Sequence, residues 1–143
     1  MNRYMICLDG STESERAFRW LESIALSDPT KDIEVYLLHV IDDKFINKID
    51  GKEDNAKRKE LGKKGVESYS IELTNNHIKN YPIIVETIHN IKDSILHQIQ
   101  KNRIEMIVVG HQEKGRIKRL LDGHGSVSDF LLKNSNIPIL IFR

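Results

Sequence analysis

Short apolar runs alternate along the chain with longer segments in which apolar residues recur at helical spacing. The short runs predict five strands, at residues 4–8, 33–40, 83–88, 104–109 and 137–142. The periodic segments predict four helices, at residues 12–26, 55–80, 91–102 and from 127 onward. A loop is predicted for residues 42–54, which show no clear period. The predicted element order is therefore β-α-β-α-β-α-β-α-β.

The predicted helix ends carry residues that cap helices. Thr12, with Glu15 three residues later, has the spacing of a capping box, and Asn90 can cap the third helix. Gly62 and Gly65 weaken the prediction of the second helix, because glycine costs about 1 kcal/mol in a helix interior relative to alanine. In the first helix, the residues predicted to face the core are Ala17, Trp20, Leu21 and Ile24.

Strands that alternate with helices predict a parallel sheet, because each parallel crossover needs a long connection. We expect an α/β fold in which an open five-stranded parallel sheet has helices on both faces, formed by one domain over residues 1–143. Ligands of such sheets bind beyond the carboxyl ends of the strands. The candidate binding loops are therefore residues 9–12, 40–43, 88–90 and 110–126.

Composition narrows the class of protein further. Lys and Arg total 22 against 21 Asp and Glu, so the net charge of +1 does not require a nucleic acid or a membrane surface as partner. No apolar run approaches the roughly 20 residues that span a bilayer. The single cysteine, Cys7, excludes an internal disulfide bond and favours a reducing compartment. We therefore expect a cytoplasmic protein, with Cys7 as an inert thiol in the first strand.

Asp9, Gly10 and Ser11 join the first predicted strand to the first predicted helix. A carboxylate at this position can accept hydrogen bonds from the backbone or from a ligand. The same residue types are also typical of a plain turn that begins a helix, and this alternative stays open.

A glycine-bearing loop follows the fourth predicted strand. Gly110, Gly115 and Gly125 allow the backbone to approach a phosphate closely, and the amides of a helix capped by Ser126 would supply positive partial charge. A flexible, solvated basic loop is the alternative. The pattern is not a Walker A loop, because no Gly-x-x-x-x-Gly-Lys-Ser/Thr occurs. The loop also carries four basic residues, Lys114, Arg116, Lys118 and Arg119.

The histidines offer one structural and one chemical interpretation. His39, at the end of an apolar strand, predicts a partly buried and hydrogen-bonded side chain. His111 and His124 lie in the glycine-bearing loop, where Asp9 or Glu113 could join them around a metal ion. Their spacing supports no such site, so we expect none.

Several motifs occur together over nearly all 143 residues: Asp9-Gly10-Ser11, residues 37–42, residues 107–110, residues 117–121, Gly125-Ser126-Val127-Ser128 and residues 137–141. With these motifs the chain resembles the universal stress protein domain. The resemblance implies a five-stranded parallel sheet of order 3-2-1-4-5, usually dimeric. One branch of this family binds ATP and another does not.

In the nucleotide-binding branch of the family, the loop after the fourth strand resembles the pattern Gly-x2-Gly-x9-Gly-Ser/Thr. The glycine spacing of this chain departs from that pattern. One alignment keeps the spacing from Gly115 to Gly125 and places two extra residues before it. The other keeps residues 117–121 in register, so that Glu113 replaces a glycine and residues 123–124 are an insertion. We favour the second alignment, because five matched positions outweigh one glycine spacing.

The resemblance implies where a nucleotide would lie. Adenine would lie near Val40 and Asp9, and the phosphates near Gly125, Ser126 and Val127. The nucleotide-binding residues predicted in this way are Asp9, Gly10, Ser11, Val40, Gly110, Gly115, Gly125, Ser126, Val127 and Ser128.

We therefore expect a stress-responsive regulatory module that binds ATP or AMP weakly or in an altered pose, with Mg²⁺ if the ligand is ATP. It would hydrolyse ATP slowly at most, and it would form a homodimer through the edge of its last strand, residues 139–142. Two alternatives stay open. The first is a nucleotide-free dimeric interaction protein whose phosphate loop is degenerate, and the second is a hydrolase or transferase that uses Asp9 and His111.

Overall fold

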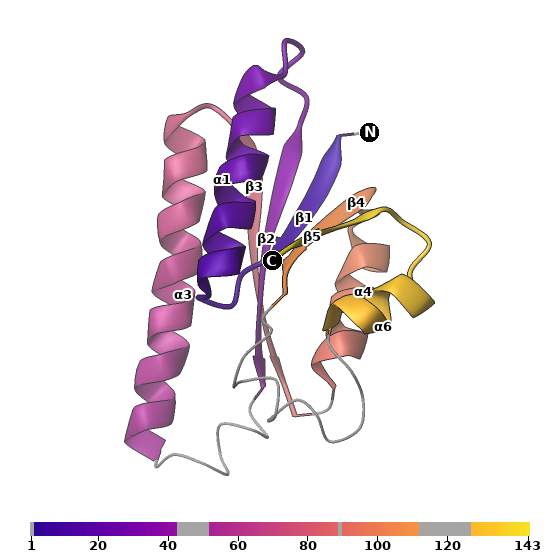
Figure 1. Cartoon of the computed structure of the whole chain (residues 1–143). Coiled ribbons are helices and arrows are strands. Elements are labelled where there is room, and N and C mark those ends of the chain that lie inside the picture. Colours follow the sequence, from indigo (N-terminus) through magenta and orange to yellow (C-terminus); the bar gives the residue numbers. More distant parts are fainter. Residues whose placement is uncertain (1, 43–51, 89, 112–126) are drawn as a thin grey trace.

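The computed structural model describes residues 2–42, 52–88, 90–111 and 127–143, which form a five-stranded sheet flanked by helices (Figure 1). The order of elements agrees with the predicted alternation. From the amino end they are β1 (Arg3–Cys7), α1 (Thr12–Ser27), β2 (Glu34–Asp42), α3 (Lys52–Asn75), β3 (Lys79–Thr87), α4 (Ile91–Lys101), β4 (Met106–Gly110), α6 (Val127–Asn134) and β5 (Ile139–Phe142).

The sheet is parallel throughout, and its strand order is β3-β2-β1-β4-β5, which confirms the expected α/β fold. Helices α1 and α3 cover one face, and α4 and α6 cover the other (Figure 1). The expected edge position of the last strand is confirmed, since β3 and β5 are the two edges. Because the strands run in one direction, their carboxyl ends meet at one edge of the sheet, here called the carboxyl edge.

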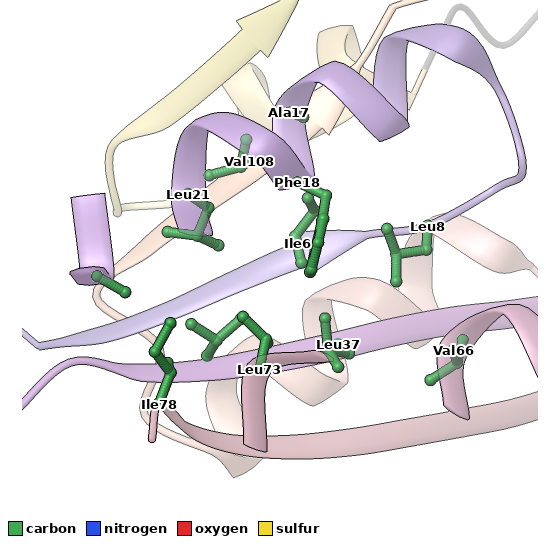
Figure 2. Packing of buried hydrophobic residues seen from close by; sticks show 12 residues of the cluster. Ile6, Leu8, Ala17, Phe18, Leu21, Leu37, Val66, Leu73, Ile78 and Val108 are labelled. Carbon is green, nitrogen blue, oxygen red and sulfur yellow. The ribbon is translucent and has the colours of Figure 1, made fainter. Parts of the chain in front are cut away.

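The core lies in two layers, because successive side chains of a strand point to opposite faces of the sheet. In β1, Ile6 packs on the side of α1 and α3, Met5 packs on the side of α4 and α6, and both are fully buried. Figure 2 shows the first layer, which brings together Phe18 of α1, Leu37 of β2 and Leu73 of α3. Burial on both faces explains why β1, β2 and β4 are nearly continuous apolar runs in the sequence.

The buried face of α1 follows the helical period, with one difference from the prediction. Ala17 is fully buried, and Trp20 is half-buried, with its ring centroid 5.9 Å from that of Phe142 in β5. The predicted inward position of Ile24 is wrong, because its side chain is 36% exposed. The buried stripe passes instead through Ala25, about 100° further round the helix.

The N-cap of α1 is Ser11 and not Thr12, which is the first helical residue. The Oδ1 atom of Asp9 accepts a hydrogen bond from the Ser11 amide at 2.9 Å, and Ser11 stays extended at φ −79° and ψ 161°. The Oγ atom of Ser11 then accepts a hydrogen bond from the Ser14 amide at 3.1 Å. The capping prediction is wrong by one residue because the turn made by Asp9 decides where the extended backbone ends.

Helix α3 ends at Asn75 and β3 begins at Lys79, whereas the predicted helix ends at residue 80 and the predicted strand begins at residue 83. His77 adopts a left-handed backbone conformation with φ 59°, and the amide of Ile78 donates to the carbonyl of Leu73 at 2.9 Å. This arrangement ends the helix without a glycine, so no sequence signal marked it. The first half of β3 was also not apolar enough to be predicted, because it lies at a sheet edge where side chains are exposed.

The other predicted ends agree more closely. Asn90 caps α4 as predicted, since its Oδ1 atom accepts a hydrogen bond from the Lys92 amide at 2.9 Å. The remaining ends differ from prediction by at most three residues. Ser126, the predicted cap of α6, lies outside the described residues.

Candidate functional site

The predicted site residues that the structure describes gather at the carboxyl edge of the sheet. They come from the connection after β1, from β2, from the end of β4 and from the first turn of α6, which are far apart in the sequence. In chain order they are Asp9, Gly10, Ser11, Val40, Gly110, Val127 and Ser128.

Part of the predicted site lies outside the described residues. This holds for Gly115, Gly125 and Ser126, and also for Glu113. The two alignments of the glycine-bearing loop therefore stay open.

The segment Asp9-Gly10-Ser11 forms the turn that begins α1. Gly10 has φ 80°, a conformation that favours glycine because a side chain would be strained there. Together with the hydrogen bond from the Ser11 amide to Asp9, this gives each residue of the motif a local structural role. The turn also sets the amino end of α1 at the carboxyl edge.

Gly110 allows the end of β4 to approach α1 closely. A Cβ atom added at Gly110 would lie 2.9 Å from the Cβ atom of Glu13 and 2.9 Å from the amide nitrogen of Ser14, both in the first turn of α1. Real Cβ atoms do not come this close to backbone, so only glycine fits here without a shift of α1. The first turn of α1 and the end of β4 therefore form one compact unit.

His111 links the end of β4 to the first turn of α6, which sequence analysis did not anticipate. Its amide donates to the carbonyl of Phe142 in β5 at 2.6 Å, so the residue continues the pairing of β4. Its Nδ1 atom lies 3.2 Å from the Oγ atom of Ser128, a hydrogen-bond distance, and Ser128 is only 4% exposed. The only sequence signal was the position of His111 directly after a strand.

An apolar wall lies beside these polar groups. Val40 of β2, Val127 of α6 and Cys7 of β1 are half-buried and pack against the same hydrophobic cluster on the α4 and α6 side. Burial, and to a lesser extent the charge of Asp9, raise the pKa of the Cys7 thiol to about 12. The thiol therefore stays protonated near neutral pH, as expected for an inert cysteine.

His39 holds β1, β2 and α3 together. Its Nδ1 atom lies 2.7 Å from the Leu8 carbonyl oxygen, and because a carbonyl can only accept, Nδ1 carries the donated proton. The opposite side of the ring faces Gly62 of α3, where an added Cβ atom would lie 2.3 Å from Nε2. The prediction of a partly buried, hydrogen-bonded histidine is confirmed, and Gly62 has a packing role that the sequence did not reveal.

Asp9 and His111, the two residues of the hydrolase or transferase alternative, contact different partners. Asp9 accepts the Ser11 amide, whereas His111 lies against Ser128. Within residues 2–42, 52–88, 90–111 and 127–143, no group of three or more His, Cys, Asp or Glu side chains is placed to hold a metal ion. In the same part of the chain, no helix combines the length and the apolar character needed to cross a membrane.

The fold and this edge define an open parallel α/β protein whose candidate ligand site lies where helix amino ends meet the carboxyl ends of the strands. The model of the universal stress protein family matches residues 1–143. The chain therefore belongs to the universal stress protein family.

Solved structures share this fold over almost the whole chain. The hypothetical protein MJ0577 is 28% identical with a TM-score of 0.75, and the match covers 99% of this chain and 96% of that one. A universal stress protein family protein from Arabidopsis thaliana with AMP bound is 20% identical, covers 99% and 91% of the two chains and has a TM-score of 0.66. The universal stress protein from Archaeoglobus fulgidus in complex with dAMP is 17% identical, covers 100% and 98%, and has a TM-score of 0.66.

A relative of much greater length is uncharacterized protein C167.05 from Schizosaccharomyces pombe. It is 25% identical over 142 residues, which cover 98% of this chain. The present chain spans only 23% of the length of that protein.

Proposed function

We propose that this chain binds an adenine nucleotide, ATP or AMP, at the carboxyl edge of its sheet and acts as a nucleotide-responsive regulatory module in the cytoplasm. The observation that carries the proposal is the convergence of two helix amino ends, those of α1 and α6, on the end of β4. Amide groups at helix amino ends favour anions. The AMP and dAMP complexes of proteins with the same fold support the choice of an adenine nucleotide.

In this proposal the polar and apolar parts of the edge have different roles. The amides of Gly125, Ser126 and Val127, the first residue of α6, would hold phosphate, together with Gly115. The apolar wall at Val40 would hold adenine, with Asp9 nearby. Mg²⁺ would accompany the phosphates of ATP.

We expect weak binding for two reasons. The hydroxyl of Ser128 is already within hydrogen-bond distance of His111, so a ligand must compete for it. If Glu113 faces the phosphates, as it would in the favoured alignment, it repels them by about 4 kcal/mol at a separation of about 4 Å and an effective dielectric constant near 20. We propose that the chain acts by binding the nucleotide and hydrolyses ATP slowly at most. Asp9 is hydrogen-bonded to the Ser11 amide and His111 lies against Ser128, so each has another partner.

Millimolar ATP with Mg²⁺ is expected to raise the melting temperature of the chain. At a ligand concentration of ten times Kd the stabilisation is about 1.4 kcal/mol, which corresponds to roughly 3–6 °C for a chain of this size. Scanning calorimetry and isothermal titration with ATP, AMP and GTP measure the effect and its selectivity.

A loop variant provides the matched comparison for this experiment. Replacing Glu113 by glycine and deleting residues 123–124 restores the family spacing and should increase the affinity for ATP at least tenfold. If neither the natural chain nor this variant binds ATP or AMP, the nucleotide proposal fails and the nucleotide-free interaction protein takes its place.

We also propose that two copies pair through the outer edge of β5. The carbonyl of Phe142 accepts from β4, so the alternate residue Ile141 turns its peptide groups outward, where a second strand can pair with them. Sedimentation at tens of micromolar should give twice the mass of one chain. Replacing Ile141 by proline removes an outward donor without cutting the bonds to β4 and should give monomers, whereas a monomeric natural chain would contradict the proposal.

A further inference from the structure

The contact between α1 and α3, which lie side by side in Figure 1, contains charged side chains that the proposed function does not use. Arg19 of α1 forms an ion pair with Glu72 of α3. It also pairs with two carboxylates of its own helix, Glu15 at 3.1 Å and Glu22 at 3.3 Å. Three carboxylates therefore share one guanidinium group, and two of them would lack a compensating charge if all three were ionised.

Glu22 is the least exposed of these carboxylates. Its side chain is 13% exposed, against 36% for Glu72 and 42% for Glu15. The Oε2 atom of Glu22 is buried and has no hydrogen-bond partner among the described residues. An ionised carboxylate in this position would combine an unsatisfied buried oxygen with repulsion from Glu72. A proton on Glu22 removes both costs, because the neutral carboxyl group can donate to the carboxylate of Glu72.

We propose that Glu22 and Glu72 share one proton across the contact of α1 and α3, and that this contact weakens when rising pH removes the proton. The proposal concerns the contact between α1 and α3, whose carboxylates are not among the candidate site residues, and it does not depend on nucleotide binding. Its physical basis is the geometry of the Glu22–Glu72 pair around a single arginine.

The expected titration of both groups supports this assignment. Burial raises the pKa of Glu22 above its ordinary value. The hydrogen bond that the protonated Glu22 makes to Glu72, and the negative charge of Glu72, raise it further, against the opposing effect of Arg19. The hydrogen bond from Glu22 lowers the pKa of Glu72, and Arg19 lowers it further. One proton held mainly by Glu22 and shared with Glu72 accounts for both directions.

The other groups at this contact do not supply the same effect. Glu15 and Arg19 come from α1 and Glu72 comes from α3. Tyr69 of α3 packs against Phe18 of α1, with ring centroids 4.2 Å apart and ring planes tilted by 40°. Glu22 is therefore the group at this contact whose pKa is raised, and its ionisation as pH rises changes the contact.

The sign of the pH dependence follows from the raised pKa. The folded chain holds the Glu22 proton more tightly than the unfolded chain does, so the stabilisation is fully present below the ordinary glutamate pKa of about 4.3. It is lost as pH rises through the higher pKa of the folded chain. Glu72 acts in the opposite direction, because stability from its lowered pKa is lost only as pH falls through that pKa.

The test compares urea unfolding of the natural chain, Glu22→Gln and Glu15→Gln from about pH 4 to pH 8, with the fluorescence of Trp20 as readout. The glutamine at position 22 imitates the neutral carboxyl group, so its unfolding midpoint should fall less than that of the natural chain as pH rises. The Glu15→Gln variant removes an exposed partner of the same arginine and should keep the pH profile of the natural chain. Parallel profiles for the natural chain and Glu22→Gln would overturn the proposal.

Direct titration provides a second measurement that does not depend on the Glu22→Gln variant. Side-chain carboxyl carbon shifts followed by NMR should place the pKa of Glu22 above the ordinary glutamate value in the natural chain. In Glu72→Gln, where the neighbouring negative charge is absent, the Glu22 pKa should move down towards that ordinary value. Titration of Glu22 at the ordinary value in the natural chain would overturn the proposal.

Discussion

Replacing Phe18 by alanine is expected to lower the free energy of unfolding by about 3–5 kcal/mol. Phe18 is fully buried on the inner face of α1, and its ring packs on that of Tyr69 with centroids 4.2 Å apart. The guanidinium of Arg19 also lies over the Phe18 ring, 5.2 Å from its centroid. The truncation therefore leaves a cavity between α1 and α3 and removes a large part of the roughly 5–15 kcal/mol that stabilises a typical domain.

The matched control for this experiment is Leu26→Ala in the same helix. Leu26 is 45% exposed, so its truncation should change the stability by no more than about 0.5 kcal/mol. Urea unfolding followed by circular dichroism measures both variants. A loss below about 1 kcal/mol for Phe18→Ala would mean that α1 does not pack on the sheet as described.

Alanine at Gly62 and alanine at Gly65 are expected to change stability in opposite directions, although both glycines lie in α3. At Gly65 an added Cβ atom meets nothing within 4 Å, so alanine should stabilise the helix by about 0.5–1 kcal/mol. At Gly62 the same atom would lie 2.3 Å from Nε2 of His39, whose ring is held by its hydrogen bond to Leu8. The chain should lose about 1–3 kcal/mol there, because either α3 or the ring must move.

A double variant tests the cause of this difference. Replacing His39 by alanine removes the ring that Gly62 faces, so Gly62→Ala should cost much less in that background. Unfolding free energies of the four proteins in the cycle measure the coupling. Equal effects of Gly62→Ala in both backgrounds would show that contact with His39 does not explain the need for glycine.

Much of the fold follows from local patterns that are visible in the sequence. The apolar runs of β1, β2 and β4 are buried on both faces, which is why their strand character was clear and their ends were correct within two residues. β3 lies at an edge and exposes much of its side chains, so only its more apolar second half was predicted. The left-handed residue His77 ended α3 without glycine, and no local signal marks such a position.

The candidate site was predictable only in part. The sequence pointed to Asp9, Gly10, Ser11 and Gly110, and the structure places them at one edge of the sheet. It also gives Gly10 and Gly110 conformational and packing reasons to be glycine, which a motif does not separate from ligand binding. The contact of His111 with Ser128 depends on how α6 lies against β4, and so it was not predicted.

From the sequence by itself came the alternating order of strands and helices, the parallel sheet and the edge that carries the candidate site, because periodicity and chain connectivity constrain these directly. Only the tertiary structure decided which distant residues meet: Gly62 against His39, Gly110 against the first turn of α1, and Glu22 against Glu72. Each pair joins two elements whose separation is set by packing across the sheet or between helices. No pattern within either element encodes that separation.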